Sequence, residues 1–241
     1  DACRAYVEDV VKGGRALEGR RGPFAFGQYS DDSQLARELL QSYVERGGFE
    51  AADYARRVAA IFTEGRIVGH GQSTEAAALR LAAGVPWADA GTPPPAAGNG
   101  SAMRAGPIGL MFHDDPKRLI AAAHDQGRVT HADPRCSAGA VAIAGAVALA
   151  LDPAPVDTAA FLGSLSGWAG AFEPSLAAYL ESLADWVALP PAEAVKRIAG
   201  AGHEPGAGER WPGISPFVVP SVLWSLYAFL RTPDDYWEAV C

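Results

Sequence analysis

Apolar residues recur at helical spacing along most of the chain, and this pattern constrains the fold more than any other feature. Leu35, Leu39 and Tyr43 are four residues apart and mark one face of a helix, which Gly47 and Gly48 end. Long alternating runs of β-branched residues, which would predict strands, are almost absent. The sequence therefore predicts an all-α protein that folds as one compact domain.

Further helices are predicted by the same periodicity, and several of them open with proline, which favours the first turn of a helix. The glycine-, proline- and charge-rich segment 202–216 predicts an exposed loop instead. The further helices are expected over 51–62, 73–84, 116–125, 134–151, 156–167, 174–187, 191–199, 216–230 and 233–241.

Composition excludes some classes of protein. The net charge of −8 and a pI near 5.1 disfavour nucleic acid as the main partner, because such binders carry a basic face. The three cysteines, Cys3, Cys136 and Cys241, form no disulfide framework, which suits a reducing compartment. No apolar run is long enough to span a bilayer. We therefore expect a cytoplasmic protein with no membrane partner, and a monomer.

Ser30-Asp31-Asp32-Ser33 precedes the first clear helix. Carboxylate and hydroxyl oxygens are ligands that Mg²⁺ and Mn²⁺ prefer. Neighbouring residues on a helix face different directions, so the two aspartates could reach two metal ions, or one metal and one water. The alternative is helix capping, since Ser and Asp are favoured at that position. These four residues alone leave both interpretations open.

Two glycine-rich segments also lead into apolar segments. Residues 69–74 form a glycine-rich turn into a helix, whose free N–H groups could bind a phosphate. Residues 98–104 contain Gly98, Asn99 and Gly100, and glycines allow backbone N–H groups to approach a ligand closely. The second segment could instead be a loop that turns into a helix, with Asn99 and Ser101 as caps, and the Gly-x-Gly pattern of the first is common in proteins. The chain has no P-loop motif.

A polar segment, Thr130-His131-Ala132-Asp133-Pro134-Arg135, precedes the long apolar helix expected over 134–151. His131 could donate a hydrogen bond to a ligand or orient a carboxylate. Alternatively it is a loop histidine, with Asp133 at the N-cap and Pro134 in the first turn. Glu8, near the start of the chain, carries no signal by itself.

Together and in this order, the motifs resemble those of the ADP-ribosylglycohydrolase family, and the resemblance covers nearly the whole chain. The segments N-G-x-x-M-R-x-x-P-I-G and T-H-x-D-P-R are its most specific parts. The matching segments are Asp1-Ala2-Cys3 with Glu8, Ser30-Asp31-Asp32-Ser33-Gln34, Gly69-x-Gly71-x-x-Thr74, the run from Asn99 to Gly109, and Thr130-His131-Ala132-Asp133-Pro134-Arg135.

The resemblance implies an all-α, orthogonal helical domain over residues 1–241 that holds two Mg²⁺ or Mn²⁺ ions. It implies that Ser30, Asp31 and Asp32 bind metal, and that Glu8, Asp31 and Asp32 are catalytic. The residues that it implies to bind ADP-ribose are Gly69, Gly71, Gly98, Asn99, Gly100 and His131.

The chain departs from the family pattern in three respects. Ser30 and Ser33 stand where the family usually has threonine, and Arg4 replaces a small residue of the opening motif. The family's second metal motif, G-D-x-D-T, normally follows a segment like 233–240, and this sequence stops at Cys241. We therefore expect the sequence to be trimmed at both ends.

The function implied is metal-dependent hydrolysis that removes ADP-ribose from a modified target. Such cleavage passes through an oxocarbenium-like transition state, and a carboxylate would accept the proton of the attacking water. An arginine of an ADP-ribosylated protein is the leaving group that we expect. The alternatives are serine-linked, poly- or O-acetyl-ADP-ribose, and a non-catalytic family member that only binds ADP-ribose.

Overall fold

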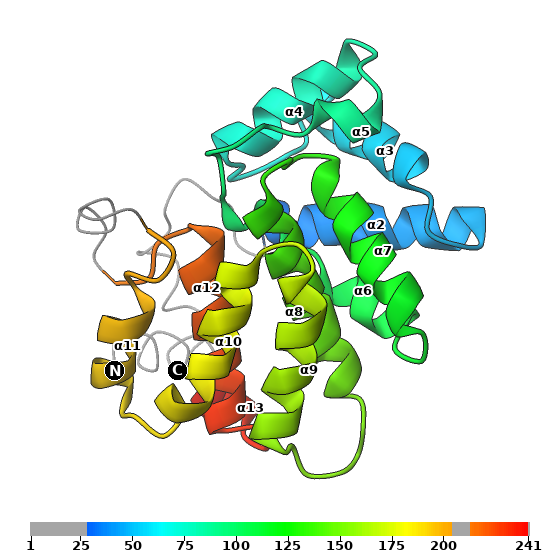
Figure 1. Ribbon diagram of the computed structural model, residues 1–241. Helices are drawn as coiled ribbons and strands as arrows, with labels where there is room; N and C mark the ends of the chain where they lie inside the picture. The colour runs from blue at the N-terminus through cyan, green and yellow to red at the C-terminus, as the bar shows by residue number, and fades with distance from the viewer. Residues whose placement is uncertain (1–27, 204–212, 241) are drawn as a thin grey trace, which may run out of the picture.

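The protein is all-α, as predicted, in the parts of the chain that the computed structural model describes, residues 28–203 and 213–240 (Figure 1). No strand occurs in those parts, and none of their helices is long and apolar enough to cross a membrane. The helices are α2 (Asp31–Arg46), α3 (Ala51–Thr63), α4 (Gln72–Ala82), α5 (Trp87–Ala90), η1 (Asn99–Ser101), α6 (Gly106–Met111), α7 (Pro116–Arg128), α8 (Pro134–Leu149), α9 (Thr158–Gly170), α10 (Pro174–Trp186), α11 (Pro191–Ile198), α12 (Val218–Arg231) and α13 (Tyr236–Val240).

The predicted long helices are confirmed with small changes at their ends. Helix α2 ends at Gly47, whose φ of 69° lies in the left-handed region that glycine adopts at little cost. Helix α8 begins as expected, with Asp133 at the N-cap and Pro134 in the first turn. The short elements α5, η1 and α6 were not predicted as helices, because they are too short to show a period.

Helix α8 lies at the centre of the fold, where its small residues let neighbouring helices approach closely (Figure 1). A Cβ atom added at Gly139 would lie 2.5 Å from Val218 Cγ2 of α12. One added at Gly145 would lie 2.8 Å from Leu165 Cδ2 of α9. The alanines and glycines of this helix are therefore packing residues rather than signs of flexibility.

Two hydrophobic clusters lie against opposite parts of α8. One joins it to helices α9 to α12 and includes Ala138 and Ala142. The other joins it to helices α2, α3, α6 and α7 and includes Val141 and Ala144. Because α8 contributes buried residues to both clusters, it connects the two groups of helices, and the loop that precedes it is fixed by the same packing.

Replacement of Gly109 by alanine should destabilise the protein, because the added Cβ would lie 2.3 Å from the backbone oxygen of Ala144 and 2.8 Å from Val147 Cβ. We expect a loss of about 1–3 kcal/mol in urea denaturation. Gly163→Ala is the matched control on exposed α9 surface, where an added Cβ meets nothing within 4 Å. This variant should be more stable by about 1 kcal/mol. Equal midpoints for the two variants would contradict the packing described.

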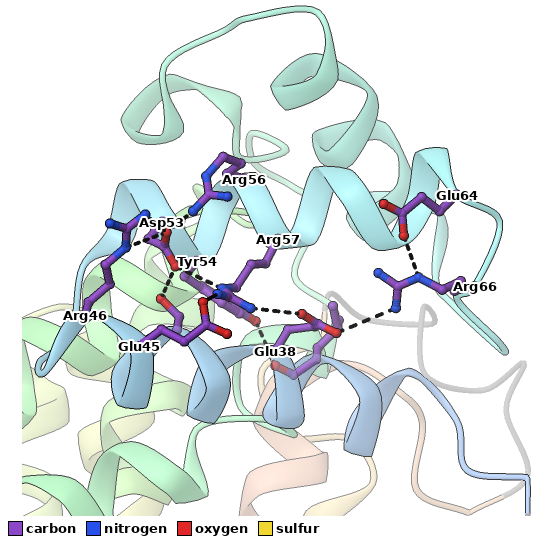
Figure 2. A network of polar contacts seen from close by, with 11 residues as sticks. Glu38, Glu45, Arg46, Asp53, Tyr54, Arg56, Arg57, Glu64 and Arg66 are labelled. Atoms are coloured by element: carbon purple, nitrogen blue, oxygen red, sulfur yellow. Dashed lines mark hydrogen bonds and ion pairs between the residues drawn. The ribbon is translucent and has the colours of Figure 1, made fainter.

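Helices α2 and α3 are joined by a polar network centred on the buried Asp53 (Figure 2). Its carboxylate accepts hydrogen bonds from Ser42 at 2.8 Å, Arg46 at 2.6 Å and Arg57 at 2.9 Å, and Arg56 also contacts it. Burial raises the pKa of Asp53, but the hydrogen bonds from Arg57, Arg46 and Ser42 outweigh it and hold the pKa well below its usual range. The charged form is therefore the one that the fold stabilises.

Asp53→Asn should lower the free energy of unfolding by roughly 2 kcal/mol at neutral pH, because the arginines lose their charged partner. An aspartate with a lowered pKa in the folded state stabilises the protein fully above its unfolded pKa of about 3.9, and loses this effect as pH falls further. The difference between wild type and variant should therefore shrink below about pH 4. Urea denaturation across pH measures it, with the exposed Asp114→Asn as control. A difference that does not change with pH would refute this assignment.

Candidate active site

The predicted metal-binding segment lies at the start of α2, where Ser30 occupies the N-cap position. Its side chain makes no capping hydrogen bond to the helix. The hydroxyl instead donates to Asp32 Oδ2 at 2.8 Å. Capping, the alternative interpretation of this motif, is therefore not what the Ser30 side chain does.

Asp31 and Asp32 face two different cavities, as expected for neighbours on a helix. Asp31 lines a cavity of about 610 Å³, whereas Asp32 lines one of about 330 Å³. Asn99 and Met103 line both cavities, so the two cavities share the segment 99–103 as a common wall. Burial raises the pKa of Asp31, and the negative charge of Asp32 raises it further. A bound cation would relieve both effects.

Gln34, in the same motif, holds the next glycine-rich segment against α2. Its amide nitrogen donates to the backbone oxygen of Arg66 at 2.8 Å, and its amide oxygen accepts from Val68 N–H at 2.8 Å. The backbone N–H of Asp31 donates to Val68 O at 2.8 Å. These bonds place Gly69 beside Asp31, with the left-handed φ of 77° that favours glycine.

The segment 97–100 also lines the larger cavity, and backbone hydrogen bonds fix it to the start of α12. Asn99 N–H donates to Pro216 O at 2.9 Å, and Val218 N–H donates to Ala97 O at 2.9 Å. A Cβ atom at Gly100 would lie 2.7 Å from His131 Cε1. The glycine therefore makes room for the His131 ring.

His131 lines the cavity but is almost fully buried, with 2% of its surface exposed. Its Nδ1 lies 2.8 Å from the hydroxyl of Thr130. Burial lowers the pKa of His131 to about 3, and the nearby charge of Arg104 adds to this effect. The imidazole is therefore neutral at physiological pH.

Two residues of the site received no role from the sequence. Arg104 is fully buried and donates to the hydroxyl of Thr130, and only its place in the motif made it notable. Phe217 lines the cavity between two flat groups: the His203 ring is 4.5 Å from it and the Arg135 guanidinium 5.1 Å. Phe217 follows a segment predicted as a loop, and no local pattern indicated its position.

The larger cavity thus brings together most of the residues that the sequence singled out. Gly69 lies beside Asp31 but does not line the cavity, and Glu8 lies outside the described residues. No group of three His, Cys, Asp or Glu side chains suited to a metal occurs in the described ranges, so metal binding stays a prediction. The predicted residues that line this cavity are Asp31, Gly71, Gly98, Asn99, Gly100 and His131.

The protein thus combines an all-α fold with paired aspartates at the start of a helix, glycine-rich segments and a buried histidine. Comparison with known proteins identifies the class to which it belongs. A model of the ADP-ribosylglycohydrolase family matches residues 2–241. The chain therefore belongs to the ADP-ribosylglycohydrolase family.

Two curated proteins are similar to about half of the chain. An uncharacterized protein of Archaeoglobus fulgidus is 33% identical over 127 residues, which are 53% of this chain and 41% of that protein. The ADP-ribosylarginine hydrolase Tri1 of Pseudomonas putida is 30% identical over 137 residues, 53% of this chain and 34% of that protein. The chain thus matches less than half the length of these curated relatives.

A solved structure, described as an ADP-ribosylglycohydrolase-related protein complex, has the same fold. It superposes with a TM-score of 0.62 at 27% identity, and the match covers 89% of this chain and 63% of that one. This likeness confirms the all-α fold that the sequence predicted.

Gln34→Ala should release the segment 66–69 from α2, because both hydrogen bonds of the amide are lost. We expect amide hydrogen exchange at Val68 to speed up by roughly tenfold or more, since its N–H donates to Gln34. Gln41→Ala, about two turns further along α2, is the control. Unchanged exchange at Val68 in the Gln34 variant would show that the amide does not hold this segment.

Proposed function

We propose that the protein is a metal-dependent hydrolase that removes ADP-ribose from a modified target. The observation that supports it most is that one cavity joins Asp31, the glycine segment 98–100 and His131. Its volume of about 610 Å³ is within the range of small-molecule sites. The family of the chain supports the same reaction class.

The start of α4 provides a place for the diphosphate of ADP-ribose. Gly71, Gln72, Ser73 and Thr74 line the cavity, and no side chain caps this end of the helix. The first N–H groups of a helix lack partners within it and favour an anion. Phe217, which also lines the cavity, offers apolar ring surface against which the adenine base can pack.

Ser30, Asp31 and Asp32 are the residues that we propose to hold two Mg²⁺ or Mn²⁺ ions, together with ligands outside the described part of the chain. Their hard oxygen atoms suit these ions. The metal would polarise the ribose hydroxyls and orient the attacking water. Asp31, Asp32 or Glu8 would accept the proton of that water.

Arginine is the linkage that we propose for the physiological target. The support is the similarity to the Pseudomonas putida protein, which is named an ADP-ribosylarginine hydrolase. Serine-linked, poly- and O-acetyl-ADP-ribose are the competing substrates. We also propose a cytoplasmic monomer that has an ADP-ribosylated protein as its partner, which agrees with the acidic charge and the cysteine usage.

Asp31→Asn and Asp32→Asn in the full-length protein should each slow the release of ADP-ribose from an arginine-modified protein by about a hundredfold or more. The reason is that an amide binds a divalent cation more weakly than a carboxylate does. Release is measured with Mg²⁺ or Mn²⁺ present, and the exposed Asp114→Asn is the control.

Undiminished release by both aspartate variants would reject the proposed metal-dependent reaction. A wild-type protein that binds ADP-ribose but releases none from arginine-, serine- or glutamate-linked substrates would instead support the non-catalytic alternative. The substrate panel also decides the linkage, because only the preferred one should be cleaved rapidly.

A further inference from the structure

A buried chain of hydrogen bonds ends at the ring of His131. The guanidinium of Arg104 donates from Nε to Gln126 Oε1 at 2.9 Å, and from Nη2 to Gln126 O at 2.8 Å. Nη2 also donates to Thr130 Oγ1 at 2.7 Å. The same hydroxyl lies 2.8 Å from His131 Nδ1. Arg104, Gln126, Thr130 and His131 are all at most 2% exposed, so water does not compete for these groups.

The donor of each of these hydrogen bonds follows from the chemistry of the two groups that form it. A guanidinium has only donors, so Thr130 Oγ1 must accept from Arg104. The hydroxyl then has its own proton to donate. In the described part of the chain its second partner is His131 Nδ1, and nothing else is in reach. If Nδ1 carried the proton, Oγ1 would accept both bonds and its own buried proton would have no partner, which is costly. Nδ1 is therefore the acceptor, and a neutral imidazole that accepts at Nδ1 carries its proton on Nε2.

The Nε2 atom lies on the cavity side of the ring. A Cβ atom added at Gly98 would be 3.7 Å from Nε2, and one added at Gly100 would be 3.3 Å from it. Both glycines line the cavity together with His131. The proton on Nε2 is thus presented beside the segment 98–100.

We propose that Arg104 and Thr130 are positioning residues that fix His131 as its Nε2–H tautomer, which donates a hydrogen bond to an oxygen atom of bound ADP-ribose. This inference rests on the proposed function, because it takes ADP-ribose as the ligand. Its new content is the role of the two buried residues, neither of which lines the cavity.

The charge of Arg104 strengthens this arrangement. In the described part of the chain its hydrogen bonds go to neutral groups only, its Nη1 has no partner, and the face of Tyr54 lies 5.6 Å from it. A positive charge at one end of a hydrogen-bonded chain polarises the groups along it. It also disfavours protonation of His131. The imidazole stays neutral, and its N–H becomes a better donor to a negatively polarised oxygen.

The direct test is the long-range ¹H–¹⁵N spectrum of the histidine rings in the wild-type protein, with His131→Asn to assign the His131 signals. At neutral pH we expect Nε2 to have the shift of a protonated ring nitrogen and Nδ1 that of an unprotonated one. An Nδ1–H tautomer or an imidazolium would overturn the proposal. This measurement requires no substitution of Arg104, Gln126 or Thr130.

A pair of variants tests the consequence for binding. Thr130→Val keeps the shape but removes the hydroxyl, so the Nε2–H tautomer should lose its preference and the affinity for ADP-ribose should fall roughly tenfold. Thr130→Ser keeps the hydroxyl and should restore both the tautomer and nearly all of the affinity. Calorimetry with ADP-ribose and the ring spectrum are measured on both. Wild-type affinity and spectrum in Thr130→Val would refute the role of this residue.

The two proposals fail in different ways. If the protein does not bind or release ADP-ribose but His131 is the Nε2–H tautomer, the proposed ligand is wrong and this inference falls with it. If ADP-ribose is released normally and His131 is the Nδ1–H tautomer, the proposed function stands. Only the positioning role of Arg104 and Thr130 is then rejected.

Discussion

The tight packing of helix α8 sets the positions of the helices around it and of the loop that precedes it. The small residues of this helix allow α9 and α12 to approach until an added Cβ at Gly145 or Gly139 would collide with a neighbour. This packing fixes the N-terminus of α8, where Asp133 caps the helix by accepting from Arg135 N–H at 3.0 Å. Thr130 and His131 lie just before this cap, so the packing of α8 also fixes the position of His131.

The candidate site is assembled from segments that are far apart in the sequence. The paired aspartates begin α2, the glycine segment 98–100 is fixed to α12, and His131 lies before α8. Each wall is fixed by hydrogen bonds of its own, such as those of Gln34 to the segment 66–68. A ligand that spans the cavity would therefore meet groups whose positions are already set, which lowers the cost of binding.

Local signals in the sequence predicted the helices well, because glycine and proline mark their ends and leucine spacing marks their faces. The candidate residues were found only through the order of their motifs, since each motif alone fits a helix start. What could not be predicted depends on contacts between distant segments. Arg104 meets Thr130 and Phe217 reaches the cavity only when the chain is folded, and no local pattern records either.

We expect the cavity lined by Asp31 and His131 to bind ADP-ribose in the presence of a divalent cation. A crystal structure of the full-length protein with Mg²⁺ and ADP-ribose tests it most directly. We expect the diphosphate beside the start of α4, the metal on Asp31 and Asp32, and an oxygen atom of the ligand at hydrogen-bond distance from His131 Nε2. Density for ADP-ribose elsewhere, with this cavity empty, would contradict it.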